Sequence, residues 1–201
     1  MVLKLLKQYK KQIIMNKALM FLVASLVSVA GIAQRGNVEL GIKGGVNLAG
    51  YNGNINSNSS RTGFHIGGLI HIHTLNPRLA IQPEIVFSTQ GASFNNGTDK
   101  IDYINIPFLL QYLGRGGLRL ETGPQVGALV SAKFEDNDGI EYDIKNQIKQ
   151  SDLSWAFGLG FLSHTGLGID ARYNLGLTDI TKGRGDVKNS VWQFGLFYQF
   201  R

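Results

Sequence analysis

The sequence predicts an all-β protein: an eight-stranded antiparallel up-and-down transmembrane β-barrel, preceded by a cleavable signal peptide. Three observations lead to this fold class. The 201-residue chain opens with a lysine-rich and then apolar segment. Beyond it, apolar side chains alternate with small or polar ones in eight segments. The connections between those segments alternate between long and short.

Composition narrows the class further. The chain contains no cysteine, which excludes a disulfide framework, cysteinyl metal ligation and a thiol nucleophile. Its mean hydropathy of −0.02 and scattered apolar residues argue against a bundle of transmembrane helices, which would need several apolar runs of about 20 residues.

The first segment has the features of an export signal. An apolar run from residue 18 to residue 30 follows five lysines, and small residues at the end of the segment suit a signal peptidase. We predict cleavage between Ala33 and Gln34, so that residues 1–33 are the signal peptide and residues 34–201 the barrel domain. Met15 is an alternative start to Met1, and a retained anchoring helix is the alternative to cleavage.

Charge in the remaining chain is nearly balanced. Removing the five lysines of the leader from 20 basic residues leaves 15, against 14 acidic residues. The apparent basicity therefore belongs to the leader, and we expect no nucleic-acid partner.

The eight predicted strands share one pattern. In residues 38–48 every second position is apolar, apart from one glycine, and the positions between are glycine, asparagine or charged. Such alternation is typical of a strand with two different faces. The other seven strands are expected at residues 64–72, 79–87, 104–112, 118–130, 153–161, 167–177 and 191–200.

The two faces differ in charge and in glycine content. No charged residue falls on the apolar face, whereas the opposite face is rich in glycine and carries Glu39, Lys43, Glu84, Arg119, Glu121, Asp170 and Arg172. Glycine weakens a strand unless a neighbour approaches closely, as it does inside a narrow eight-stranded barrel. We therefore expect the apolar face outside, against lipid, and the seven charged residues in the lumen as a polar cluster.

Loop lengths agree with an outer-membrane barrel. Short connections are expected at 74–78, 114–117 and 163–166, and long ones at 49–61, 91–99, 131–152 and 178–190. Short periplasmic turns and long outer loops are the layout of such barrels. Pro83, Pro107 and Pro124 fall inside predicted strands. Proline has no backbone N–H to donate to a neighbouring strand, so we expect these residues at bulges or at the rim of the barrel.

Two sets of polar residues on the inward face are candidate sites: the seven charged residues and the histidines of residues 64–73. The seven charges could line an ion path, but opposite charges in so narrow a lumen favour a balanced ion-pair plug with low conductance. His71 and His73 lie two apart on the strand that also carries His65, and without a third ligand they do not predict a metal site. We expect no cofactor, no metal and no catalytic residue.

Several sequence blocks resemble a known family. They are Gly41–Asn47, Gln82–Ser88, Tyr103–Pro107, Glu121–Gln125 with Ser131–Lys133, and Gly168–Leu177. Together they resemble the PorT-like outer membrane beta-barrel family common in Bacteroidetes. The resemblance implies an outer-membrane location and no catalytic motif, and the family's name-giving member is tied to type IX secretion and gliding. Arg201 after the terminal aromatic Phe200 departs from the common outer-membrane ending.

The expected function is a structural or surface-interaction role for an outer-membrane barrel with a plugged polar lumen. Its expected partners are outer-membrane lipid and the barrel-assembly machinery, with an extracellular or secretion-system protein left open, and the chain is expected to be a monomer. Two alternatives remain: a barrel-embedded lipid- or lipopolysaccharide-modifying enzyme using His65 or His71, and a secreted soluble barrel that binds an apolar ligand.

Overall fold

A computed structural model of the chain describes residues 38–53, 59–182 and 186–200. The predicted signal peptide and its cleavage site between Ala33 and Gln34 lie outside these residues. Among the helices of the described part, none has the length and hydropathy to cross a membrane.

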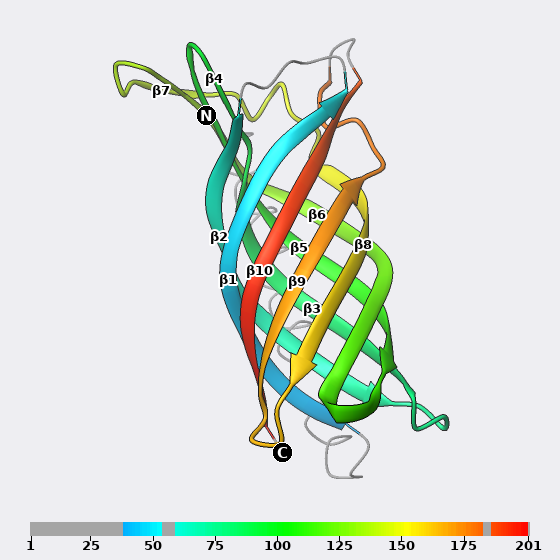
Figure 1. Cartoon of the computed structure of the whole chain (residues 1–201). Coiled ribbons are helices and arrows are strands. Elements are labelled where there is room, and N and C mark those ends of the chain that lie inside the picture. The colour runs from blue at the N-terminus through cyan, green and yellow to red at the C-terminus, as the bar shows by residue number, and fades with distance from the viewer. Residues whose placement is uncertain (1–37, 54–58, 183–185, 201) are drawn as a thin grey trace, which may run out of the picture. The chain divides into compact units, whose positions relative to one another are not determined.

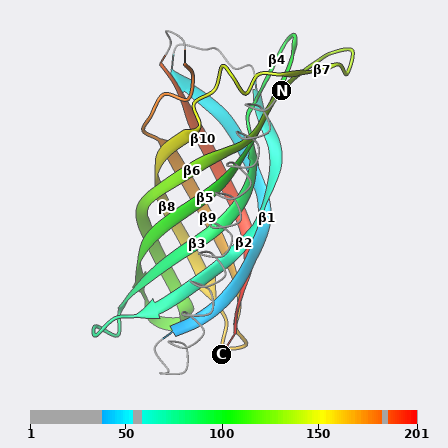
Figure 2. The same cartoon turned by 180° about the vertical axis from the view of Figure 1, so that it is seen from behind.

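Eight long strands form a closed barrel, which confirms the predicted fold class (Figures 1 and 2). Consecutive long strands are hydrogen-bonded neighbours, and antiparallel pairing of the first with the last closes the sheet. The long strands are β1 (Val38–Gly53), β2 (Ser59–His73), β3 (Leu79–Gln90), β5 (Gly97–Leu113), β6 (Leu118–Asp136), β8 (Ser151–Leu162), β9 (Leu167–Gly176) and β10 (Val187–Phe200).

The strands run further than predicted at the long-loop end. Beyond the barrel wall the start of β5 and the end of β6 remain paired with each other, β4 (Ala92–Phe94) pairs with β5, and β7 (Glu141–Asp143) pairs with β6 (Figure 1). We call β4, β7 and the strand ends that pair with them the β4–β7 extension. All four predicted long loops, 49–61, 91–99, 131–152 and 178–190, were therefore wrong in part, because strand residues occupy some of each. Alternation of apolar and polar side chains does not predict these strand ends, because few of their side chains are apolar. Their backbones are nevertheless hydrogen-bonded as strands.

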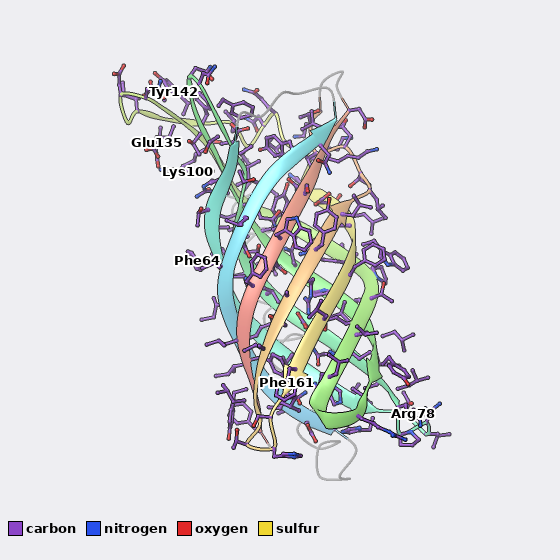
Figure 3. The ribbon with its side chains drawn as sticks, in the orientation of Figure 1. Phe64, Arg78, Lys100, Glu135, Tyr142 and Phe161 are labelled. Carbon is purple, nitrogen blue, oxygen red and sulfur yellow. The ribbon has the colours of Figure 1, made fainter. Side chains whose placement is uncertain are left out.

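The apolar faces of the strands point outward. Ile42 and Leu196 are 57% and 58% exposed, and Figure 3 shows Phe64 and Phe161 on the outer surface at different heights. A continuous band of exposed apolar side chains is stable only against hydrocarbon. The alternative of a soluble barrel with an apolar centre is wrong for this reason.

Aromatic residues flank this band. Toward the long loops lie Phe64, Trp155 and Trp192, and toward the short turns lie Phe161 and Tyr198, all of them exposed. Such girdles mark the two membrane interfaces of outer-membrane barrels.

The prolines lie within the strands without shifting the register. The β3–β5 ladder loses two residue pairs next to Pro83, and the β5–β6 ladder loses two next to Pro107, yet the register is the same on both sides of each gap. Pro83 and Pro124 face outward and add to the apolar band. The expectation that the prolines mark bulges or rim positions was wrong: all three lie inside strands, and the register shift of the β5–β6 ladder occurs at Asp102/Tyr103.

Glycine has two separate roles in the barrel, one on the inner face of a strand and one in a turn. A Cβ at Gly168 would overlap the ring of Phe197, an aromatic side chain that points inward from β10. At the β5–β6 turn, which contains the 3-10 helix η1 (Arg115–Gly117), Gly116 and Gly117 have φ values of 71° and 96°. That backbone conformation is costly for other residues.

Candidate functional site

The centre of the lumen is occupied by one buried arginine and two carboxylates. Arg172 on β9 donates from Nη1 and Nη2 to the two carboxylate oxygens of Glu84 on β3, both at 2.8 Å. Its Nε donates to Oε1 of Glu121 on β6, also at 2.8 Å. All three side chains are buried. The planar guanidinium fork suits this geometry, because it can serve two carboxylates at once.

A lysine extends the same network. Lys43 on β1 lies 2.7 Å from Asp170 and 3.5 Å from Glu84. Two amides complete the hydrogen bonding: Gln82 donates to Glu84 at 2.8 Å and Gln111 donates to Glu121 at 2.9 Å.

The network reaches across the full width of the barrel. In the closed sheet β3 and β9 are four strands apart, so the Arg172–Glu84 pair joins strands that face each other across the lumen. Lys43 and Glu121 likewise come from facing strands, β1 and β6. The structure thus brings five of the seven predicted cluster residues together in one ion-pair network.

The other two predicted residues lie nearer the short-turn end. Glu39 lies 3.5 Å from His73. Arg119 donates to Gln199 at 2.8 Å, and its guanidinium lies 5.7 Å from the centre of the Phe197 ring.

On the long-loop side of the ion pairs lies a layer of amide side chains that the sequence analysis missed. Asn47 Oδ1 accepts from His65 Nδ1 at 2.8 Å and from Gln193 Nε2 at 3.1 Å. Asn174 in turn donates to Gln193 at 3.0 Å, and Asn47 donates to Ser88 at 3.0 Å. These amides occupy the inward positions of strands that were predicted, so a search for Asn and Gln on the charged face would have found them.

Two of the three histidines of β2, His65 and His71, contact side-chain amides. His65 pairs with Asn47, and His71 Nδ1 lies 3.4 Å from Gln82 Oε1, with its ring packed edge-on against His73. Within the described residues no group of three histidine or carboxylate side chains could hold a metal ion.

The long-loop end is covered by an apolar cap, which we define as Tyr51, Ala92, Ile101, Tyr103, Ala132, Ile148, Ile180 and Val187. Ile148 and Ile180 belong to the β7–β8 and β9–β10 connections, within the predicted loops 131–152 and 178–190. A β-bridge between Ile148 and Thr181 joins these two connections. Lys149 N donates to Ile180 O at 2.7 Å, and Lys182 N donates to Gln147 O at 2.9 Å.

Carboxylates anchor the cap. Asp152, directly beneath it, accepts from Thr178 and Asn189, both at 3.0 Å. Asp179 Oδ1 accepts from the backbone and hydroxyl of Thr181, at 3.1 and 2.9 Å. Desolvation acts to raise the pKa of Asp179, but hydrogen bonds from Thr181, Val187 and Lys149 together outweigh it and the pKa is lowered. Asp179 is therefore ionised at neutral pH.

Comparisons with known proteins agree with this architecture. Residues 32–182 match the sequence profile of the outer membrane protein beta-barrel domain. No curated protein matches the sequence.

Solved structures share the fold. The Neisserial surface protein A, NspA, has 12% identity and a TM-score of 0.57, over 80% of this chain and 97% of that one. Ail, the attachment invasion locus protein of Yersinia pestis, was solved with the heparin analogue sucrose octasulfate. It has 20% identity and a TM-score of 0.50, over 82% of this chain and 99% of that one.

Barrel closure, an apolar outer band with aromatic girdles, and the profile match together place the protein in the outer membrane. The profile matches residues 32–182, and the alignment with NspA covers 80% of the chain. The chain belongs to the outer membrane protein beta-barrel domain family.

Proposed function

We propose that this outer-membrane barrel has a structural or surface-interaction role and acts as a monomer with a plugged lumen. The observation that carries the proposal is the contact of Arg172 with Glu84 across the lumen and with Glu121 on a third strand. A barrel of eight strands has an interior just wide enough for side chains to fill. Ion pairs that cross this interior leave no continuous aqueous path.

Two barriers in series support the plug. The ion-pair network occupies the middle of the lumen, and the apolar cap covers its long-loop end. An ion that crosses the barrel would have to break buried charge pairs and also enter an apolar layer, both of which are costly.

Single-channel recording in planar bilayers tests the plug. The wild-type barrel should show no steady conductance. The charge-balanced double variant Glu84→Ala/Arg172→Ala removes the cross-lumen pair, and Ile148→Ser/Ile180→Ser loosens the cap. Steady current is expected when all four substitutions are combined.

A matched control uses an inward pair that does not cross the lumen. Gln125 donates to Ser154 on the neighbouring strand at 3.0 Å. Gln125→Ala/Ser154→Ala should leave the barrel silent. A wild-type protein that conducts as well as the quadruple variant would contradict the plug.

The surface role is proposed for the β4–β7 extension. Its outer face carries paired charges: Lys133 lies 2.6 Å and Lys100 3.1 Å from Glu141, and Lys100 also pairs with Glu135 (Figure 3). Tyr142 at its edge is half exposed. We propose an extracellular or secretion-system protein as the partner of this surface. The sequence blocks that resemble the PorT-like branch support this choice.

Site-specific photo-crosslinking on intact cells tests the partner. A crosslinker at Tyr142 should capture a defined protein, whereas one at Leu75, on the opposite end of the barrel, should not capture it. Equal capture from both positions would contradict the surface role.

The proposal includes no catalytic step. The hydrogen-bond partners of His65 and His71 within the described residues are the amides of Asn47 and Gln82. Neither ring is paired with a serine hydroxyl or a carboxylate there, as a hydrolytic triad would require.

A further inference from the structure

The two ends of the barrel differ in charge. The long-loop end carries charges of both signs: most of the acidic residues outside the lumen, such as Glu135 and Glu141, and lysines that pair with them, such as Lys100 and Lys133. The three short turns, 74–78, 114–117 and 163–166, contain Arg78, Arg115 and His164 and no acidic residue. We call these three turns the short-turn rim. It is basic and lies next to the aromatic girdle formed by Phe161 and Tyr198.

Arg78 and Arg115 come from neighbouring turns. The two turns are joined where Leu113 N donates to Arg78 O at 2.8 Å, because β3 and β5 are paired. Both arginine side chains are exposed, and neither has an ion-pair partner within the described part of the chain. Figure 3 shows Arg78 on the turn that projects sideways from the barrel wall.

The β2–β3 turn is rigidly built and still leaves a leucine in the open. Thr74 Oγ1 donates to Leu79 O at 2.9 Å, and Arg78 N donates to Asn76 Oδ1 at 2.9 Å. Pro77 restricts the backbone between them. Leu75 nevertheless has an exposed fraction of 108%, the highest among the exposed large apolar residues of the described structure. A preorganised turn that exposes an apolar side chain beside arginines suits the boundary between lipid headgroups and acyl chains.

A groove lies at the same rim. Its volume is about 190 Å³, and it runs between the η1 turn and the β8–β9 turn. Leu113 and Leu118 line it on the apolar side, and Ser163 and His164 add polar groups. The rim therefore combines cations, hydrogen-bonding groups and apolar walls.

We propose that the short-turn rim binds the phosphate headgroup of an anionic phospholipid through Arg78 and Arg115, with Leu75 in contact with the acyl chain. Guanidinium groups recognise phosphate by paired charge-assisted hydrogen bonds. A lipid supplies both the anion for the arginines and the hydrocarbon for the leucine, whereas free phosphate supplies only the anion. In outer-membrane barrels the short turns face the periplasm, so the lipid belongs to the inner leaflet.

Native mass spectrometry of the full barrel released from detergent tests the proposal. Phosphatidylglycerol is the probe, and phosphatidylcholine is the comparison. The wild type should retain phosphatidylglycerol in preference to phosphatidylcholine. Arg78→Gln/Arg115→Gln should lower the retained phosphatidylglycerol roughly tenfold, since it removes two charge-assisted contacts. Heat-modifiable migration on a gel establishes that each variant is folded.

Lys145→Gln/Lys188→Gln is the matched control, because it removes the same charge at the opposite end. It should retain phosphatidylglycerol like the wild type. Equal loss in the two double variants would show only a net-charge effect and would overturn the proposal.

Leu75→Ser separates a lipid site from a phosphate site. We expect weaker phosphatidylglycerol retention in this variant and little displacement of lipid from the wild type by inorganic phosphate. Unchanged retention in Leu75→Ser, together with full displacement by phosphate, would overturn the assignment to a lipid.

Discussion

At the scale of single residues, Arg172 has the most demanding environment in the barrel. It is 1% exposed and forms three hydrogen bonds of 2.8 Å to two carboxylates. Its removal would leave Glu84 and Glu121 buried without this cation. Breaking a buried ion pair from one side costs far more than the pair contributes to stability.

We predict that Arg172→Ala lowers the free energy of unfolding by about 3–5 kcal/mol. Arg172→Lys should recover only part of this loss, because an ammonium lacks the planar fork that meets both carboxylates. Equilibrium urea unfolding of the barrel in lipid vesicles measures both effects. A lysine variant as stable as the wild type would show that charge alone matters.

The hydrogen bonds that Asp179 accepts from Thr181 and Val187 are expected to respond to acid. Because its pKa in the folded protein is lowered, its contribution to stability is present above the pKa of the unfolded chain and is lost as the pH falls through the folded value. The contacts of Asp179 with Thr181 should thus persist at neutral pH and weaken only below about pH 4.

NMR titration of the Thr181 and Val187 amide protons measures this transition, since both amides donate to Asp179 Oδ1. In Asp179→Asn the low-pH transition should disappear. A transition that survives the substitution would assign it to another group.

At the scale of elements, the cap depends on two connections that hold each other. Ile148 and Ile180 are both buried; Ile148 forms the bridge with Thr181, and Ile180 directly precedes Thr181 in the β9–β10 connection. Neither connection has a long strand of its own in this region, so its order depends on apolar contacts with the other.

We predict that Ile148→Ser speeds hydrogen exchange at the amides of Lys149 and Lys182, which donate across the two connections. Truncating a buried isoleucine side chain lowers the free energy of unfolding by about 2–5 kcal/mol. Ile140→Ser is the control, because Ile140 precedes β7 but is 53% exposed. Equal exchange in both variants would contradict the role of the cap.

At the scale of the whole molecule, the outer band determines where the protein is stable. Leu196 lies in the middle of the outward face of β10, and Phe200 lies at its short-turn end. Arginine in place of Leu196 should cost about 2–4 kcal/mol in a bilayer, and in place of Phe200 about 0–1 kcal/mol.

Equilibrium unfolding in vesicles compares Leu196→Arg with Phe200→Arg. The expected depth dependence follows from the cost of moving a charge into hydrocarbon. In a protein surrounded by water, both exposed substitutions would be nearly neutral. Equal effects at the two positions would therefore contradict the proposed position of the band in the membrane.

The strands and their faces could be predicted from the sequence, because the alternation of side chains along a strand is a local property. Leu196 alternates with inward positions in any extended backbone, whatever its neighbours are. The same reasoning predicted that Lys43, Glu84 and Arg172 share a face. This reasoning did not predict the β4–β7 extension, because the strands there are paired although their side chains do not alternate between apolar and polar.

Only the tertiary structure decided which charges meet. Glu84 and Arg172 are 88 residues apart, and they come together because closure of the sheet sets β3 opposite β9. The cap likewise brings together Ile148 and Ile180, which are distant in the sequence. The pattern of residues around each of them does not predict this contact. Alternation along each strand determines inside and outside, whereas ring closure and register determine the partners across the lumen.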